Sequence, residues 1–329
     1  MSKKRILSGM RPTGKLHLGH LVGALDNWIK LQEEYECFFM VADWHALMGE
    51  YEKPQILSES IIDNVVDWLS VGIDPDKSVL FIQSQVPEHL ELQMIFSCLT
   101  PLGWLERCPT YKEQLREVET RDLHTYGFLG YPVLQAADIL LYKAAKVPVG
   151  EDQLPHLELT REIARRFNSL YNHEIFPDPG AILAKTPRLL GLDGRKMSKS
   201  YDNTINLSDP EDLIKKKISN MITDPKRIKL ADQGHPSVCN VFAYYAVFFP
   251  GMKDELHKAC SGAGLGCVEC KKRLSSSLIE LLKPIQKKRL ELLKDKENII
   301  KILEHGRIKA SVAASATIKE VKAAMKISL

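Results

Sequence analysis

The sequence lacks several features that would place it among membrane, secreted or repetitive proteins. No apolar run approaches the roughly 20 residues that a membrane-spanning helix needs. The N-terminal residues Met1–Lys4 lead directly into a predicted strand rather than into the apolar core of a signal peptide. No internal repeat and no low-complexity segment is evident. We therefore expect a globular protein of the cytoplasm, and 329 residues are enough for two domains.

The chain also has little net charge, a surplus of only +3, but this charge is unevenly spread. From Tyr201 to Leu329 there are 23 Lys and Arg residues against 15 Asp and Glu, whereas the preceding residues carry a small negative balance. A basic C-terminal region suits contact with a polyanion such as RNA, and it equally suits a solvated helical surface. Charge alone does not choose between the two.

Short apolar runs alternate with amphipathic helical patterns over the first part of the chain. The runs predict buried strands at Ile6–Leu7, Cys37–Ala42, Val79–Ile82 and Val147–Val149. Helical spacing between them predicts intervening helices, one of which runs from Pro54 to Gly72. This alternation indicates an α/β fold with a mostly parallel sheet and right-handed crossovers. Such sheets bind ligands at the carboxyl ends of their strands.

A polar loop around Asp193–Asn203 marks the predicted end of this first domain. Beyond it the pattern is helical almost throughout, apart from a Gly- and Cys-rich segment at Ser261–Cys270. We therefore predict an α/β domain over residues 1–204 and a helical region over residues 205–329.

The chain's first strand is followed by a short motif that suits a nucleotide. Turn residues at Ser8–Gly9 and Pro12–Gly14 precede a helix start that carries His17-Leu18-Gly19-His20, an H-x-G-H pattern. Backbone N–H groups and two imidazoles at one point favour a bound phosphate. Gly19 has no side chain, so a flat purine ring can approach the backbone there. A match this short also arises by chance.

A second motif, K-M-S-K-S at Lys196–Ser200, follows the sequence L-D-G-R at Leu192–Arg195. A loop with several cations, a glycine and hydroxyl groups can close over a triphosphate and its departing pyrophosphate. Taken alone, the segment is also explained by a basic loop exposed to solvent. The two motifs together, about 180 residues apart, are far less expected by chance, and the pairing resembles the class I aminoacyl-tRNA synthetases.

The resemblance extends over essentially the whole chain and is most specific for the tryptophanyl- and tyrosyl-tRNA synthetases. The segments that carry it are Ser8–Gly14, Val41–His45, Tyr131–Pro132, Ala136–Tyr142, Val147–Gln153 and His156–Arg161. Among them, Gly150-Glu151-Asp152-Gln153 followed by His156-x-Glu158-Leu159-Thr160-Arg161 favours the tryptophanyl enzymes.

Membership of that family implies a fold, a reaction and partners. The fold is a Rossmann-like parallel-sheet catalytic domain with a C-terminal α-helical anticodon-binding region. The reaction activates L-tryptophan with ATP and Mg²⁺ to tryptophanyl-adenylate and pyrophosphate, and then transfers tryptophan to tRNA(Trp). Tyrosine is the alternative amino acid. The resemblance also implies a homodimer.

The resemblance assigns roles residue by residue. The group that stabilises the transition state comprises His17, His20, Lys112, Lys196 and Lys199. The ATP-binding set comprises Arg11, Pro12, Thr13, Gly19, His20, Gly150, Glu151, Asp152, Leu189, Lys196, Met197, Ser198, Lys199 and Ser200. The amino-acid set comprises Tyr131, Gln135, Asp138 and Gln153.

One helix leaves the choice of amino acid open. Tyr131, Gln135 and Asp138 lie at i, i+4 and i+7, on one face, and this spacing also occurs in tyrosyl enzymes. A buried Asp accepts a hydrogen bond from an indole N–H or from a phenol O–H. A pocket of this kind rejects an analogue without the donor by roughly 10⁴–10⁵, so no editing domain is needed. Nothing in the chain resembles one.

Four of the seven cysteines fall within one short segment, as Cys239-x20-Cys260-x6-Cys267-x2-Cys270. Clustered cysteines in a cytosolic chain indicate a metal site more than disulfides. Four unrelated thiols and a zinc site remain alternatives. A subset of bacterial tryptophanyl enzymes carries a similar pattern, with a slightly longer first spacing, that holds a 4Fe–4S cluster near the anticodon. Lys271, Lys272 and Arg273 would suit a nearby RNA backbone.

The remaining histidines are expected to have no part in the chemistry. His45 follows a predicted strand, so a structural role and a ligand-binding role are equally open. We expect surface or loop positions for His89, His124, His173, His235, His257 and His305.

Overall fold

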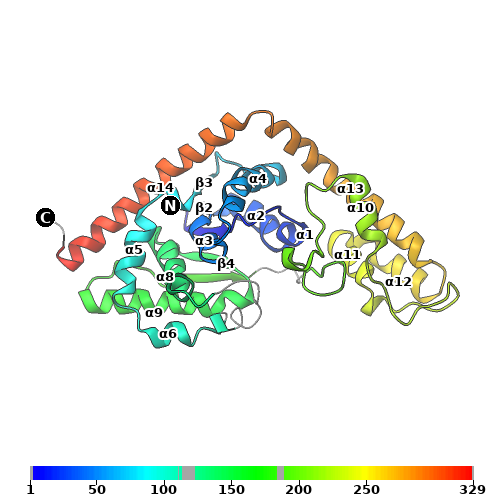
Figure 1. The fold of residues 1–329 in the computed structure, drawn as a ribbon, viewed down its shortest axis with the longest axis horizontal. Coiled ribbons are helices and arrows are strands. Elements are labelled where there is room, and N and C mark those ends of the chain that lie inside the picture. Colours follow the sequence, from blue (N-terminus) through cyan, green and yellow to red (C-terminus); the bar gives the residue numbers. More distant parts are fainter. Residues whose placement is uncertain (1–2, 110, 113–122, 184–188, 328–329) are drawn as a thin grey trace. The chain divides into compact units, whose positions relative to one another are not determined.

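The computed structural model describes residues 3–109, 111–112, 123–183 and 189–327 (Figure 1). It divides into two compact units. The first comprises Met1–Gly14, Asn27–Ala184 and Asp295–Leu329, and the second comprises Lys15–Asp26 and Lys185–Lys294.

The first unit is built on a parallel five-stranded sheet. Its strands are β1 (Arg5–Met10), β2 (Glu36–Val41), β3 (Ser78–Ile82), β4 (Lys146–Val149) and β5 (Gly180–Leu183). Their order in the sheet is β3-β2-β1-β4-β5, with every described pair parallel. The predicted parallel α/β sheet is therefore confirmed. β5 is not among the predicted strands; it is a short strand whose residues are only partly buried or exposed.

The first strand is longer than predicted. Ser8 and Gly9 pair with Phe39 and Met40 of β2 instead of beginning a turn. At Gly9 a Cβ atom would lie 3.0 Å from the Met40 carbonyl oxygen, so glycine permits the close strand pairing. The chain turns only afterwards, with Gly14 at a positive φ of 103°.

The helices of the first unit surround the sheet and build one core. They are α2 (Asp26–Glu34), α3 (Asp43–Glu50), α4 (Gln55–Val71), α5 (Glu88–Ser97), α6 (Leu102–Glu106), α8 (Tyr126–Leu141), α9 (Leu154–Tyr171) and α14 (Lys296–Met325). The core joins apolar side chains of the sheet with those of α5, α8, α9 and α14. In Figure 1, α14 runs beside β3 and α5, and it covers the edge strand of the sheet.

The order of the strands fixes where a ligand of this unit would bind. The chain leaves β1 toward β2 and β3 on one side, whereas β4 and β5 lie on the other. A crevice forms at such a switch point, outside the carboxyl ends of the two central strands. The segments that follow these strands are Arg11–Gly14 after β1 and Gly150–Gln153 after β4.

The second unit is helical in its described part. It contains α1 (Leu18–His20), a π-helical turn (Leu21–Leu25), α10 (Glu211–Ser219), α11 (Asn240–Phe248), α12 (Lys253–Ser261) and α13 (Cys267–Leu292). Backbone hydrogen bonds attach its N-terminal segment: Leu18 N–H donates to the Ile205 oxygen at 2.9 Å, and Leu207 N–H donates to the Leu16 oxygen at 2.9 Å. Helices α10 and α13 pack through buried Ile214, Ile218 and Leu278.

The two units do not follow the predicted division at residue 204. The segment Lys15–Asp26 packs with the second unit through the backbone bonds just described, and α14 packs on the sheet of the first. Both departures arise from contacts between segments far apart in the chain, which a pattern of local periodicity does not contain.

No helix in the described ranges has an apolar stretch long enough to cross a membrane.

Candidate active site

The H-x-G-H motif forms a compact turn with defined hydrogen-bond directions. His17 is the N-cap of α1, and its Nδ1 accepts from the Gly19 N–H at 3.1 Å. The His20 Nδ1 accepts in turn from the His17 N–H at 3.1 Å. The two ring centroids lie 3.8 Å apart. Because each Nδ1 accepts from a backbone N–H, the proton of each neutral ring lies on Nε2.

Both imidazoles are neutral at neutral pH. Burial lowers the pKa of His17 to about 4, with a further contribution from the charge of Lys199. Burial also lowers the pKa of His20 well below its usual value, and His17 and Lys199 lower it further. The pair therefore offers two Nε2–H donors without a positive charge of its own, and the cation is Lys199.

The second motif lies in a hairpin of the same unit. The Gly191 N–H donates to the Arg195 oxygen at 2.7 Å, and the Met197 N–H donates to the Leu189 oxygen at 3.3 Å. Lys196 is exposed, whereas Met197 is buried. Ser198 precedes a 3₁₀ turn at Lys199–Tyr201, which includes Ser200.

Asn203 holds this hairpin together. Its Oδ1 accepts from the Ser198 N–H at 2.8 Å. Its Nδ2 donates to the Lys196 oxygen at 3.0 Å and to Asp193 Oδ1 at 2.7 Å. Asn203 is 3% exposed, so these three hydrogen bonds are shielded from bulk water. The sequence gives no specific sign of this role beyond a polar residue in a polar loop.

The structure brings the two motifs into contact. A Cβ atom at Gly19 would lie 3.0 Å from the His17 ring and 3.4 Å from the Met197 sulfur. Lys199 is near enough to lower the pKa of both histidines. Gly19 therefore leaves room for the His17 ring and for Met197, in addition to any nucleotide.

In the first unit, Asp138 of α8 is the centre of a buried polar network. Its Oδ2 lies 2.7 Å from His45 Nε2, and its Oδ1 lies 2.6 Å from His89 Nδ1. Gln83 Nε2 donates to Oδ1 at 2.8 Å. Burial on its own raises the pKa of Asp138, but the charges of His89 and His45 and their hydrogen bonds outweigh it and lower the pKa to about 2. Asp138 is therefore an ionised acceptor.

A second network starts from Tyr131, two turns earlier on the same helix. The Tyr131 hydroxyl lies 2.8 Å from His156 Nε2, and His156 Nδ1 lies 3.0 Å from Gln153 Oε1. Burial lowers the pKa of His156 to about 4, and the nearby His45 lowers it further. Neutral His156 therefore donates from Nδ1 and accepts the Tyr131 O–H at Nε2. Gln135 lies between the two networks in sequence and is partly buried.

The other residues assigned from the sequence are distributed as follows. Arg11, Thr13 and the exposed segment Gly150–Asp152 follow β1 and β4 in the first unit, together with buried Pro12. Lys112 is exposed in the first unit, where its N–H donates to the Cys108 oxygen. His17, Gly19, His20, Leu189 and Lys196–Ser200 belong to the second unit.

The expectation of a surface or loop position for His89 is wrong. The side chain is fully buried on α5, and its Nε2 lies 2.8 Å from the Tyr142 hydroxyl while Nδ1 contacts Asp138. His45 also contacts Asp138, and Gln83 and His156 were not assigned any role. Each of these contacts joins residues between 25 and 93 positions apart, so no local pattern contains them.

The four clustered cysteines lie in the second unit and influence one another. Burial raises the pKa of the Cys270 thiol to about 12, and the charges of Cys239, Cys260 and Cys267 add to the rise. The Arg227 side chain contacts Cys260, with Nη1 3.7 Å from the sulfur. A Cβ atom at Gly234 would collide with that sulfur. Thiolates are suitable donors for zinc or an iron–sulfur cluster. Among the described residues, no three His, Cys, Asp or Glu side chains are arranged to hold a metal ion.

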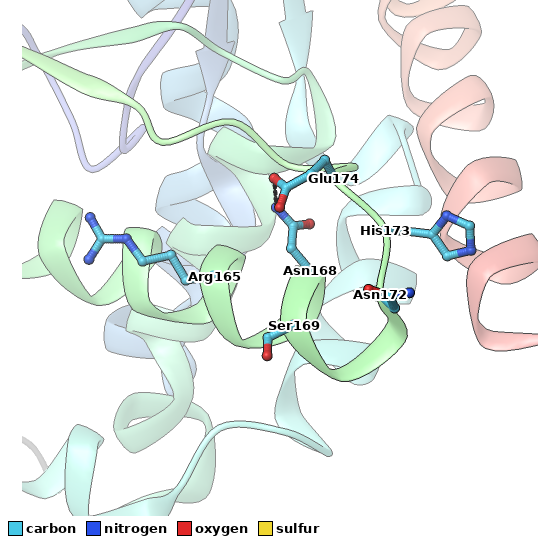
Figure 2. Close-up of a pocket in the computed structure, with 6 residues that line it drawn as sticks. All are labelled: Arg165, Asn168, Ser169, Asn172, His173 and Glu174. Carbon is cyan, nitrogen blue, oxygen red and sulfur yellow. Dashed lines mark hydrogen bonds between the residues drawn. The ribbon is translucent and has the colours of Figure 1, made fainter.

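A polar hollow of about 410 Å³ at the end of α9 contains none of the assigned residues. Figure 2 shows its lining, which comprises Arg165, Asn168, Ser169, Asn172, His173 and Glu174. Asn168 ties the following loop to the helix, since its Oδ1 accepts from the Ile175 and Phe176 N–H groups. Its Nδ2 donates to Glu174, as the dashed line in Figure 2 marks. These contacts describe a helix end rather than a reactive site.

Comparisons with known proteins identify the family of the chain. The family model described as tRNA synthetases class I (W and Y) matches residues 2–283. A tryptophan–tRNA ligase of Thermotoga maritima is 52% identical over 326 residues, which span 98% of this chain and 99% of that relative. A tryptophan–tRNA ligase of Aquifex aeolicus is 44% identical, with 98% of this chain and 100% of the relative covered.

Solved structures give the same result. The tryptophanyl-tRNA synthetase of Campylobacter jejuni, complexed with ADP and tryptophan, matches with a TM-score of 0.88 and 34% identity. That match covers 98% of this chain and 99% of the other. A tyrosyl-tRNA synthetase of Archaeoglobus fulgidus matches with a TM-score of 0.68 at 21% identity, which is a likeness of fold.

Proposed function

The chain belongs to the tryptophan–tRNA ligases, within the class I tRNA synthetases for tryptophan and tyrosine, and from this premise we propose how its residues carry out the reaction. Tryptophan is joined to the α-phosphate of ATP and then transferred to tRNA(Trp). The observation that carries the first step is the neutral pair His17 and His20, whose Nε2–H groups are the available donors beside Lys199.

In the first step the tryptophan carboxylate attacks the α-phosphorus, and pyrophosphate leaves. No protein nucleophile is required, so the residues act by position and by charge. His17 and His20 donate to the α-phosphate oxygens, whose negative charge grows in the transition state. Lys196, Lys199 and Lys112 bind the departing pyrophosphate, which carries Mg²⁺ as part of the substrate complex.

ATP binding is proposed for the residues that the family resemblance assigns. In the first unit, Arg11, Pro12, Thr13 and Gly150–Asp152 follow the two central strands at the switch point, where open sheets of this type bind nucleotides. In the second unit, the residues are Gly19, His20, Leu189, Lys196, Met197, Ser198, Lys199 and Ser200.

Tryptophan binding is assigned to Tyr131, Gln135, Asp138 and Gln153. Ionised Asp138 accepts from the indole N–H. The Tyr131 hydroxyl donates its proton to His156. A lone pair of the hydroxyl oxygen is therefore directed toward other donors. An ammonium group such as that of the amino acid is a donor of this kind. Gln153, bonded to the same histidine, fixes the direction of this network.

We propose that residues 1–204 carry the adenylation chemistry and that residues 205–329 bind the anticodon. The anticodon-binding role is supported by the positive charge of the C-terminal region. Between Tyr201 and Leu329 there are 23 Lys and Arg residues and 15 Asp and Glu residues. Lys271, Lys272 and Arg273 on α13 follow Cys270 directly. The spatial units differ from this functional division, as described above.

We propose that Cys239, Cys260, Cys267 and Cys270 hold a 4Fe–4S cluster, with zinc as the alternative. The cysteine spacing and the mutual effect of the thiols on their pKa values support this assignment. When bound, the group would join the N-cap of α11 to α12 and α13. Anaerobically purified protein is expected to contain iron and sulfide and to be brown. A colourless protein that contains zinc instead would reject the cluster.

We also propose a cytoplasmic homodimer. Large apolar side chains are exposed on neighbouring helices of the first unit: Met94 is 64%, Leu102 61% and Tyr126 76% exposed. Such exposure is typical of a surface that meets a partner. Light scattering is expected to give twice the chain mass, and Met94→Lys with Tyr126→Lys is expected to give a monomer.

ATP–pyrophosphate exchange with tryptophan and tyrosine in parallel tests the function. Exchange is expected with L-tryptophan, and exchange with L-tyrosine alone would overturn the choice of amino acid. His20→Ala is expected to lower kcat by about 10²–10³-fold, the usual effect of removing one donor to a developing oxyanion. Lys199→Ala is expected to be similarly severe.

Exposed His257 on α12 provides a matched control in the same unit. His257→Ala is expected to leave kcat unchanged. If adenylate formation survives in both His20→Ala and Lys199→Ala, the proposed chemistry is wrong.

A further inference from the structure

We propose that His89, held by Tyr142, is a positioning residue that fixes which oxygen of Asp138 accepts the ring N–H of tryptophan. This inference rests on the proposed function, in which Asp138 is the acceptor for the indole. It adds a reason why this carboxylate has only one orientation, and it makes His89 and Tyr142 determinants of specificity.

The acceptor capacity of Asp138 is almost used up by the protein itself. Each carboxylate oxygen has two lone-pair directions. Oδ1 accepts from Gln83 Nε2 at 2.8 Å and from His89 Nδ1 at 2.6 Å. Oδ2 has one contact, His45 Nε2 at 2.7 Å. Counting the contacts of the described residues, Oδ1 is saturated, and the acceptor direction left for a ligand lies on Oδ2.

His89 cannot leave Oδ1 without losing both of its partners. The ring is fully buried, with its centroid 6.0 Å from that of Phe81 and nearly parallel to it. Nε2 lies 2.8 Å from the Tyr142 hydroxyl. Tyr142 is itself fully buried and packs against Phe38 with the ring centroids 4.8 Å apart. Both ends of the imidazole are therefore fixed.

Tyr142 holds the other end of the imidazole. Burial and the charge of Asp138 raise the pKa of Tyr142 well above its usual value, so its hydroxyl keeps its proton. That hydroxyl lies 2.8 Å from His89 Nε2. His89 Nδ1 lies 2.6 Å from Oδ1 of the ionised Asp138, which can only accept, so Nδ1 carries a proton. The chain Tyr142–His89–Asp138 therefore always presents a donor to Oδ1.

Removal of this donor opens a second acceptor direction on Oδ1. The carboxylate then has two competing orientations, and the N–H of tryptophan no longer meets one fixed oxygen. A site built to bond a donor rejects analogues without one because its own polar group is left unpaired. A carboxylate free to turn relieves that penalty, so the variant is expected to lose discrimination more than general activity.

The test compares L-tryptophan with β-(3-benzothienyl)-L-alanine, in which sulfur replaces the ring N–H, in ATP–pyrophosphate exchange with the full-length chain. For His89→Leu, the ratio of kcat/KM for tryptophan to that for the analogue is expected to fall by about tenfold or more, as when one buried hydrogen bond is lost. The KM for tryptophan is expected to rise and the analogue's kcat/KM to increase, with the KM for ATP unchanged.

Two further variants separate positioning from mere packing. In His89→Asn, the amide Nδ2 stands near the place of the histidine Nδ1, and the ratio is expected to stay within about threefold of the unmodified chain. In Tyr142→Phe, the His89 ring loses its hydrogen-bond partner at Nε2 and is less firmly held, and the ratio is expected to fall by about threefold or more. His305→Leu, at an exposed position of α14, is the matched control.

Each outcome decides the matter. Equal losses for both substrates in His89→Leu and His89→Asn would overturn the inference and leave His89 a packing residue. If His89→Leu does not fold, Tyr142→Phe decides: a lowered ratio supports the inference and an unchanged ratio overturns it. Failure of the unmodified chain to activate tryptophan overturns the proposed function, and this result is visible before any variant is compared.

Discussion

At the scale of single residues, hydrogen-bond direction determines what the histidines can do. In His17 and His20, each Nδ1 accepts a backbone N–H, so only Nε2 is left to donate to a ligand. In His89, Nδ1 lies 2.6 Å from the ionised Asp138, so it is Nδ1 that carries a proton. The same residue type thus offers an Nε2–H donor in one unit and is a fixed partner of a carboxylate in the other.

The lowered histidine pKa values predict a pH dependence of stability. In the folded chain the pKa of His156 is about 4, compared with 6.5 for an unperturbed histidine. Between these values the unfolded chain binds a proton that the folded chain does not, so the free energy of unfolding decreases as pH falls from 7 toward 4. For one such histidine the decrease from pH 7 to pH 5 is about 2 kcal/mol.

His156→Gln tests this directly. All four tryptophans lie in the first unit with His156, so urea unfolding followed by tryptophan fluorescence reports this unit. The difference between pH 7 and pH 5 is expected to shrink by about 2 kcal/mol in the variant. His305→Gln is the exposed control and should leave the difference as it was. An undiminished difference in His156→Gln would contradict the assignment.

At the scale of elements, Asn203 is expected to keep the Leu189–Asn203 hairpin closed. Asn203→Ala removes the three hydrogen bonds that the Asn203 side chain makes to Ser198, Asp193 and Lys196 of the hairpin. The hairpin should therefore open more often. Trypsin cleaves after Arg195, Lys196 and Lys199, and limited proteolysis there is expected to be faster by about tenfold. Asn220→Ala, at an exposed helix end of the same unit, should not change the rate. Equal cleavage rates in both variants would show that Asn203 does not restrain the hairpin.

The contact of α14 with β3 predicts opposite effects for two helical glycines. A Cβ atom at Gly306 would collide with the Leu80 backbone, whereas a Cβ atom at Gly130 in α8 meets nothing within 4 Å. Gly306→Ala is therefore expected to destabilise the first unit by about 1–3 kcal/mol through overpacking. Gly130→Ala should be neutral or stabilising by up to about 1 kcal/mol. Fluorescence-detected urea unfolding of both variants makes the comparison, and equal effects would count against the close packing.

At the scale of the whole molecule, the C-terminal helix is expected to be necessary for the first unit. Ala310, Ala314 and Val321 of α14 are fully buried in the core that the sheet builds. Deletion of residues 295–329 should therefore expose apolar surface, increase dye binding and lower the midpoint of the tryptophan fluorescence transition. Val312→Lys, at a position 69% exposed on the same helix, should change neither quantity. An unaltered midpoint after the deletion would mean that α14 does not stabilise the first unit.

The sequence by itself determined the fold class, the reaction and most of the family assignment. Strand and helix patterns are local, since each depends on the spacing of apolar residues within one element. The motifs at His17–His20 and Lys196–Ser200 are local in the same sense, and the long matched segments add specificity. Asp138 was assigned from such a segment, although its partners were not.

Only the tertiary structure decided the partners of Asp138, the proton positions and the extent of each compact unit. His89 and Asp138 are 49 positions apart and meet because α5 and α8 pack together. The contact of Gly306 with Leu80 joins segments more than 200 positions apart, and it brings the last helix back to the sheet. The physical reason is the same in each case: burial and hydrogen-bond satisfaction are set by what surrounds a side chain in space, and local periodicity does not contain that information.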